Sequence, residues 1–479
     1  MNRTRTKLGR LLLVPLLGLA IFSGCAMRPV GEKAERARAK DAGKAWNEPV
    51  QLPDLPEKPA VDDYLRYAFL ANSDLQVRYW EWRAAIEQVP QVSSFPNIAL
   101  PFSVMFSSEK MRLWDRTTLG LSNDPMNNIP FPTKLSAAGR NALERARAAG
   151  TRFEEAKFLL QGKVLATYYD LALLGESIRI QQKNVSLLTT TTRLASVRSA
   201  TAMAGQQDLL KAQTELDLAR NQLESLWSQV PPLVVKMNAL LGRPADAPVP
   251  LPDELPPQRK LDISDSDLIR LGSERSPELA ALAREVAGQQ EALALAKQGY
   301  LPDFSLSASV TGSIAQTLGG MIILPTRLAA IRGAIDESQA NLKAASAART
   351  QYQRDLAASF VLNLYVLRND DRQVALFQET IIPRARQMVQ IGQSAYVSGR
   401  ISFVELLDSQ RTQLDASLIL AQLRMEREKA LAAIETWSAV DAEAMKSPRF
   451  DMRGGMGSAP ARKASATVPA SGSPSGGGM

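Results

Sequence analysis

The sequence predicts a mainly helical protein that contributes two β-hairpins to a membrane β-barrel. Three observations lead to this fold class. In the segment 303–311, apolar side chains fill the even positions, and Ser or Thr fills the odd ones after Asp303. A related segment lies 206 residues earlier. Most of the remaining chain is rich in Ala, Leu, Glu, Gln, Lys and Arg, which favour helices.

The alternation occurs twice in the same phase. Residues 95–104 resemble residues 301–310, and the even shift keeps apolar side chains on even positions. Each copy returns to a Pro and a basic residue, at Pro132-Thr133-Lys134 and Pro325-Thr326-Arg327. We therefore expect hairpins at about 96–132 and 302–325. Successive side chains of a strand point to opposite faces, and an apolar face opposite small hydroxyls fits a strand between lipid and water. The side chains expected to face lipid are Ile98, Leu100, Phe102, Phe304, Leu306 and Val310.

Residues 1–24 have the pattern of a secretory signal peptide. Four basic residues precede an apolar run from Leu11 to Ile21, which is too short to span a bilayer. The run ends at Phe22-Ser23-Gly24-Cys25, which resembles a bacterial lipobox, although Phe22 replaces the usual Leu. We expect Cys25 to be acylated; the alternative is an incidental buried cysteine. Ala26 follows where an Asp would indicate retention in the inner membrane, so the outer membrane is favoured.

Composition excludes several function classes. The chain has one Cys and no His, so an intramolecular disulfide, a His-based catalytic triad and a His-based zinc site are all absent. We expect no enzyme, no metal site and no cofactor. The net charge of +8 comes from the signal peptide and the C-terminal tail, while residues 25–444 are neutral. Nucleic acid is therefore not an expected partner.

The proline-rich stretches and the changes in composition divide the chain into six segments. We expect a signal peptide at 1–24, an extended lipidated tether at 25–60, and a first repeat at 61–243. A Pro-rich linker at 244–263, a second repeat at 264–440 and a disordered tail at 441–479 follow. Helices are expected at about 135–195, 206–241 and 327–395, and then to about 439. Pro383 should break or kink the third of these.

The geometry of these elements requires partners. The helix expected at 327–395 would be roughly 100 Å long, too long for a compact globule. Each chain supplies only about four strands, whereas membrane barrels need about eight or more and tolerate no open edge in lipid. One chain cannot close such a barrel, but three copies would supply about 12 strands.

Over residues 61–440 the chain resembles the TolC family of outer-membrane efflux proteins. The resemblance rests on the tandem repeat, on Tyr300-Leu301-Pro302-Asp303 at the strand entry, and on MNALLGRP at 237–244. Its most specific part is YVSGRISFVELLDSQ at 396–410. The resemblance implies a homotrimer whose 12-stranded barrel continues as a long α-helical coiled-coil tunnel in the periplasm. It also implies docking to a periplasmic adaptor and an inner-membrane pump. The chain would then be the pump's exit duct, passively conducting drugs, metal ions or other small solutes.

The same resemblance suggests residues for a periplasmic gate. Family members carry acids at the positions of Glu405 and Asp408, where the tunnel narrows, and Asp208 is the counterpart of Glu405 in the first repeat. Tyr396 matches a Tyr that helps to close the aperture. Arg400 lies one place before the usual gate Arg, where Ile401 stands. The alternative is that these acids only favour the start of a helix. Gly205 and Gly399 are expected at the turns of the tips, where an adaptor would bind.

The sequence leaves alternatives open for the transported solute and for the class of function. Residues 129–135 resemble a Pro-Phe-Pro-Gly-Lys-Leu signature of the heavy-metal branch, with Thr133 in place of Gly. The soft ligands left are the 14 Met, which we interpret as core residues. Drug and metal ion both stay open as cargo. The alternative function is a lipid-anchored coiled-coil scaffold without a pore, which leaves the repeated apolar–hydroxyl alternation unexplained.

Overall fold

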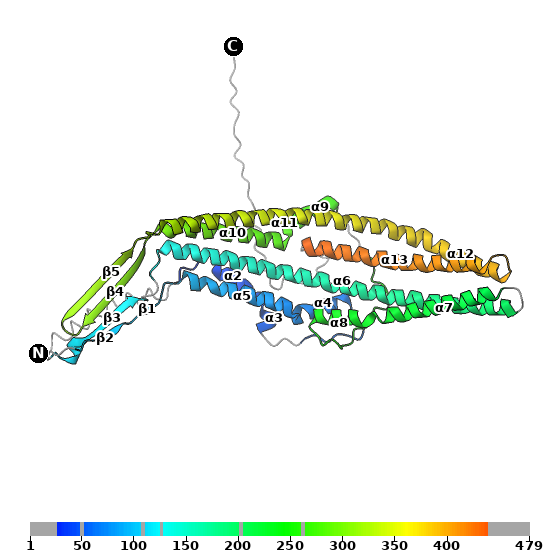
Figure 1. Ribbon diagram of the computed structural model, residues 1–479, viewed down its shortest axis with the longest axis horizontal. Coiled ribbons are helices and arrows are strands. Elements are labelled where there is room, and N and C mark those ends of the chain that lie inside the picture. The colour runs from blue at the N-terminus through cyan, green and yellow to red at the C-terminus, as the bar shows by residue number, and fades with distance from the viewer. Residues whose placement is uncertain are drawn as a thin grey trace, which may run out of the picture.

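The computed structural model describes residues 26–47, 52–106, 111–124, 128–200, 205–259 and 264–438. The molecule is elongated, with a sheet at one end and long helices that run side by side away from it (Figure 1). The expected signal peptide, Cys25 and the tail at 441–479 lie outside the described residues.

The two expected hairpins form one antiparallel sheet. Its strands are β1 (Ile98–Ala99), β2 (Phe102–Val104), β3 (Thr117–Asn123), β4 (Asp303–Thr311) and β5 (Ala315–Ile323). β1 and β2 both pair with β3, β3 pairs with β4, and β4 pairs with β5. Pro101 separates β1 from β2 because it has no N–H for the ladder, while its carbonyl accepts a 2.7 Å bond from the Gly120 amide. The short helix η1 (Leu113–Arg116) precedes β3.

Strand register gives the sheet two chemically different faces. Leu119 lies opposite both Phe102 and Val310, and Leu306 lies opposite Gly320, so apolar side chains share one face. On the other face Thr118 lies opposite Thr311, and their hydroxyls are 2.9 Å apart. Leu100 and Phe102 are 74% and 76% exposed, so the apolar face has no cover within the chain. Asp303 is the only charged residue in the five strands.

The helices of the first repeat are α4 (Val61–Ala71), α5 (Ser73–Ser93), α6 (Pro132–Ala200), α7 (Gln206–Trp227) and α8 (Val230–Leu241). The Asn72 side chain caps α5 by accepting the Leu75 amide at 3.0 Å. The expected single helix at 206–241 is two helices, because Pro231 and Pro232 cannot donate the backbone bonds that would continue α7. Gly242 ends α8 with a φ of 65°, as its position before Pro244 indicates.

The second repeat follows the same plan. It contains α9 (Asp265–Arg275), α10 (Pro277–Lys297), the short helix η2 (Gln298–Tyr300), α11 (Leu328–Leu376), α12 (Ile382–Val397) and α13 (Phe403–Ser438). A π-helical turn, η3 (Phe377–Ile381), joins α11 to α12 directly before Pro383. The proline therefore does not end the helix. The helix continues through the wider turn, and proline and π-turns are both places where a helix can bend.

An aromatic core fixes the first repeat. Trp82 and Phe153 stack with ring centroids 5.6 Å apart, and Tyr79 meets Phe153 edge to face at 6.0 Å. These three side chains are completely buried. Fully burying aromatic side chains stabilises a fold by about 2–3 kcal/mol each. α5 is thus held along α6 near the sheet (Figure 1).

The expectation of an extended tether at 25–60 is wrong for residues 32–47. Residues 32–42 form α2 and residues 44–47 form α3. Glu35 is buried and accepts a 3.0 Å bond from the Trp82 indole, and Ala39 is completely buried. The sequence EKAERARAKDA has no apolar stripe, so periodicity could not reveal the helix. It is held instead by polar contacts to α5.

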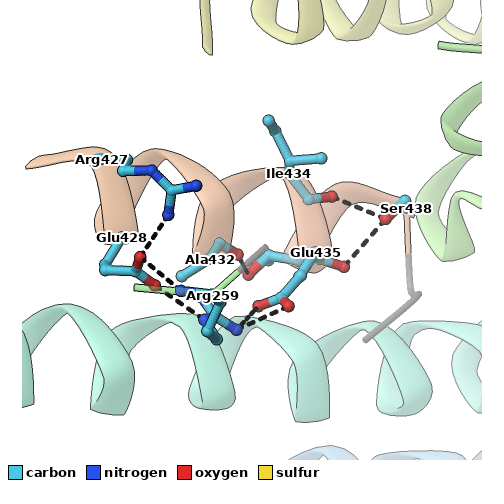
Figure 2. Close-up of polar contacts among 8 residues, drawn as sticks. Arg259, Arg427, Glu428, Ala432, Ile434, Glu435 and Ser438 are labelled. Atoms are coloured by element: carbon cyan, nitrogen blue, oxygen red, sulfur yellow. Dashed lines mark hydrogen bonds and ion pairs between the residues drawn. The ribbon is translucent and has the colours of Figure 1, made fainter. Parts of the chain in front are cut away.

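The Pro-rich linker is fastened to α13 by a buried ion network (Figure 2). The Arg259 guanidinium donates to Glu428 at 2.9 Å and to Glu435 at 2.8 Å, and Arg427 donates to Glu428 at 2.5 Å. Burial alone lowers the pKa of Arg259, but attraction to Glu435 and Glu428 leaves that pKa above its ordinary value. Removing one member of such a group leaves a buried charge unpaired, at a cost of about 3–5 kcal/mol. The linker is therefore part of the packed body.

Candidate functional site

The candidate site lies at the end of the molecule farthest from the sheet, where α6 and α7 meet α12 and α13 (Figure 1). The α12–α13 turn has the hydrogen bonds of a Schellman motif. The Gly399 amide donates to the Tyr396 carbonyl at 3.0 Å, and the Arg400 amide donates to the Ala395 carbonyl at 2.8 Å. Gly399 has a φ of 74°, which favours glycine. The turn between α6 and α7, residues 201–204, lies outside the described residues.

The two glycines expected at the tips differ. Gly399 is a turn residue whose backbone needs glycine. Gly205 has a φ of −72° and a ψ of 150°, which any residue adopts, and it precedes α7 as its N-cap. Only Gly399 therefore has a conformational reason to be glycine. Whether either residue contacts an adaptor stays a prediction.

Glu405 and Asp408 are both exposed near the start of α13. Glu405 accepts a 3.0 Å bond from the Ser402 amide, and the Ser402 hydroxyl accepts a 3.3 Å bond from the Glu405 amide. This reciprocal pair is a capping box, so Glu405 has a local role in starting the helix. No comparable local hydrogen bond is donated to the Asp408 carboxylate among the described residues. The geometry thus shows a cap at Glu405 and leaves both charges facing solvent.

Tyr396 is not at the surface of the tip. Its side chain is 1% exposed and meets Phe403 edge to face, with centroids 5.9 Å apart. The Arg198 guanidinium lies 4.5 Å from the centre of the Tyr396 ring and also donates to the Tyr396 backbone carbonyl. Burial raises the pKa of the Tyr396 phenol, Arg198 opposes that rise, and Asp208 adds to it. The half-buried Asp208 is therefore electrostatically coupled to this ring.

Sequence reasoning missed Arg198, the arginine that contacts Tyr396 within this chain, and named Arg400, whose gate role stays a prediction. Arg400 is exposed and its guanidinium donates to the nearby Ser398 hydroxyl at 2.9 Å, so it stays within its own turn. Arg198 reaches the turn from the end of α6, 198 residues earlier in the chain. A signal was present, since Arg198 is the last basic residue before the tip of the first repeat. Its partner, however, could be found only from the packing of α6 on α12 and α13.

The described residues contain no group of three or more His, Cys, Asp or Glu side chains arranged to hold a metal ion. No described helix has a stretch long and apolar enough to cross a bilayer.

No protein-family model matches the chain. Among curated proteins it is 23% identical over 410 residues to the pyoverdine export outer membrane protein OpmQ of Pseudomonas aeruginosa, covering 78% of this chain and 83% of OpmQ. It is 21% identical over 394 residues to the cobalt-zinc-cadmium resistance protein CzcC of Cupriavidus metallidurans, covering 77% of this chain and 88% of CzcC.

Solved structures give the same answer for the fold. The outer-membrane channel OprN superimposes with a TM-score of 0.69 at 19% identity, over 84% of this chain and 96% of OprN. The outer membrane protein VceC of Vibrio cholerae superimposes with a TM-score of 0.67 at 16% identity, over 79% of this chain and 95% of VceC. The chain therefore has the fold of outer-membrane channels of the TolC type, and its curated relatives include outer-membrane export proteins.

These likenesses agree with the resemblance found in the sequence, and the relatives and structural neighbours are proteins of the bacterial outer membrane. The channel fold also accounts for the architecture, because the sheet and the tip occupy opposite ends of the elongated molecule (Figure 1). The relatives are export and channel proteins rather than enzymes. Roles for the individual tip residues stay predictions.

Replacing Arg198 with Ala should loosen the α12–α13 turn, because the change removes both the ring contact and the bond to the Tyr396 carbonyl. These contacts together contribute about 1–2 kcal/mol, so the Gly399 and Arg400 amides should exchange with deuterium roughly tenfold faster. The matched control is Arg193→Ala, an exposed residue on the same helix. Equal exchange in parent and Arg198→Ala would mean that the Schellman turn holds without Arg198.

Proposed function

We propose that the chain is the outer-membrane exit duct of a tripartite efflux pump and passively conducts small solutes from an inner-membrane pump to the exterior. The observation that carries this proposal is the two-faced sheet. One face is mainly apolar and exposed in the described chain. The other carries mostly Ser, Thr and Gly, with Met321 and Ile323 near one end and no charge beyond Asp303. Lipid outside and water inside would satisfy both faces. A scaffold without a pore has no use for this arrangement.

The sheet supports assembly as a homotrimer. Its outer strands, β1–β2 and β5, each pair on one side only within the described chain. An unpaired edge is not tolerated in lipid, so neighbouring copies would supply the missing partners. Three copies give a closed barrel of about 12 strands when β1 and β2 are taken as one interrupted strand. The long helices would then surround a common tunnel, whose far end would meet a periplasmic adaptor.

The N-terminal segment supports a lipid anchor at Cys25. The Met27 amide donates to the Ser93 carbonyl at 2.9 Å, and the Met27 carbonyl lies close to Gly139. Ser93 ends α5 and Gly139 lies near the start of α6, both on the sheet side of the helical body. Met27 is thus fixed on the sheet side of the helical body, and Cys25 precedes it by two positions in the sequence, which suits an acyl anchor at that residue.

Replacing Cys25 with Ser should abolish incorporation of labelled palmitate, because the thiol is the acylation site in a lipobox. The fold should be retained, because Ser and Cys are side chains of similar size. Ala26→Ser is the matched control and should keep the label. Label retained on Cys25→Ser would contradict lipidation at this residue.

Leu306→Arg should impair insertion, because it places a charge on the lipid-facing side at a cost of about 2–4 kcal/mol near the bilayer midplane. Ser307→Arg, on the opposite face of the same strand, should be mild. The measurement is the yield of detergent-extracted protein with a protein mass of three chains. Equal yields would show that the assigned facing is wrong. A folded, water-soluble monomer of the parent would overturn the channel itself.

For the gate, we propose that Glu405 and Asp408 form rings of carboxylates around the periplasmic mouth of a trimer, with Asp208 contributing. Such rings concentrate cations and make conduction cation-selective and dependent on salt. The proposal is supported by the exposure of both carboxylates at the start of α13. Tyr396 and Arg198 would hold the turn that carries them, while Arg400 would remain local to that turn.

The double variant Glu405→Gln with Asp408→Asn removes both charges but keeps the capping box, because Gln also caps at this position. We expect a smaller reversal potential across a salt gradient in planar bilayers, and weaker block by trivalent cations. Asp415→Asn, exposed farther along α13, serves as the control. An unchanged reversal potential together with unchanged block would assign these acids to helix capping alone.

A further inference from the structure

A polar groove of about 500 Å³ lies between α6, α12 and α13, in the part of the helical body nearer the tip. Its lining residues fall on one face of each helix, at spacings of three, four and seven residues. Packed helices usually face one another with apolar side chains. These faces also carry polar and charged side chains: Lys183, Asn184, Arg386, Gln390, Gln410 and Gln413. The volume lies in the range of small-molecule sites.

The α12 side of this groove begins directly after an irregular helical turn. The π-helical turn η3 ends at Ile381, and the next residue, Ile382, lines the groove. A π-turn inserts an extra residue and changes which side chains of the following helix face its neighbours. The groove is therefore a place where regular packing of α12 on α6 and α13 is interrupted.

Gln410 supplies an unpaired acceptor in the groove. Its side chain is 1% exposed, and its Nε2 donates to the Thr191 hydroxyl at 2.8 Å. Thr191 in turn donates its own hydroxyl proton to the Leu187 carbonyl at 3.0 Å, so the hydroxyl can only accept from Gln410. This fixes the amide orientation and leaves Gln410 Oε1 without a donor among the described residues. A buried acceptor in that state costs about 1–3 kcal/mol, which a ligand hydroxyl would recover.

The groove also carries uncompensated positive charge. Neither Lys183 nor Arg386 has a carboxylate within ion-pair distance in the described part of the chain. The acid in the lining, Glu176, is already paired with Arg179 at 2.7 Å. A ligand would therefore meet two cations and several neutral amides, of which Gln410 has an acceptor without a donor in the described residues. Carboxylates suit the cations, and two nearby cations repel an ammonium donor, so the donor for Gln410 is a hydroxyl.

We propose that this groove binds small hydroxycarboxylates. Their carboxylates contact Lys183 and Arg386, and their hydroxyl donates to Gln410 Oε1. The aliphatic side chains that complete the lining, among them Leu187 and Val389, receive the carbon skeleton. The site is distinct from the proposed gate, and its ligand binds whether or not the chain conducts solutes. Its failure and the failure of the duct proposal are therefore separable.

The test uses the full chain in detergent and isothermal titration calorimetry with citrate as the probe. Tricarballylate, which has the same three carboxylates but no hydroxyl, is the matched ligand. We expect citrate to bind about fivefold more tightly, the effect of one neutral hydrogen bond to a buried acceptor. Arg386→Gln and Lys183→Gln should each weaken both ligands about tenfold. Arg384→Gln, an exposed residue on α12 outside the groove, should change neither.

Gln410→Met decides between this site and a solvated gap between helices. Met has a similar volume and no strong acceptor, so citrate should weaken to the affinity of tricarballylate while tricarballylate itself is unchanged. A change in packing alone would alter the affinity for both ligands, so it would not produce this shift in preference. Absence of citrate binding to the parent, or a preference for citrate that survives Gln410→Met, would overturn the proposal.

Discussion

The pairing of β3 with β4 is the constraint on which the rest of the structure depends. These strands belong to different repeats, and their register, with Leu119 opposite Val310, aligns the apolar faces of both hairpins. The same pairing brings the start of α6 beside the strand entry of the second repeat. There Lys134 donates to Asp303 at 2.8 Å and to the Leu301 carbonyl at 2.8 Å. From this junction both repeats leave the sheet in the same direction, and the helices stay parallel to the long axis (Figure 1).

A body that is long and thin offers little depth for an apolar core. The two repeats are therefore joined partly by buried polar contacts at points along the helices. Arg259 with Glu428 and Glu435 fastens the linker to α13 (Figure 2). Gln410 with Thr191 joins α13 to α6. Such contacts have strict geometry, and breaking one leaves a buried group unsatisfied. They specify the alignment of helices whose apolar stripes alone would permit sliding.

The tip combines a self-sufficient turn with a contact from a distant helix. The Schellman bonds at Gly399 and the capping box at Ser402 need only residues 395–405. Arg198 links this turn to α6 in two ways, through a contact with the Tyr396 ring and a hydrogen bond to the Tyr396 carbonyl. A turn built in this way keeps its local shape while its position relative to α6 depends on one side chain. That division is suited to an element whose placement controls an aperture.

The sequence by itself determined the two-faced hairpins, the tandem repeat, the long helices and the Gly ends of α8 and α12. Each depends on the order of neighbouring residues, through the period of two in strands, helix propensity, or a glycine with positive φ. Only the tertiary structure decided that residues 32–47 pack as helices, that Pro383 sits behind a π-turn, and that Arg198 rather than Arg400 reaches Tyr396. The packing of residues 32–47 and the contact of Arg198 depend on partners 40 to 200 residues away, such as Glu35 with Trp82 or Arg198 with Tyr396. A local sequence pattern cannot identify such a partner, because the contact forms only when the helices lie side by side.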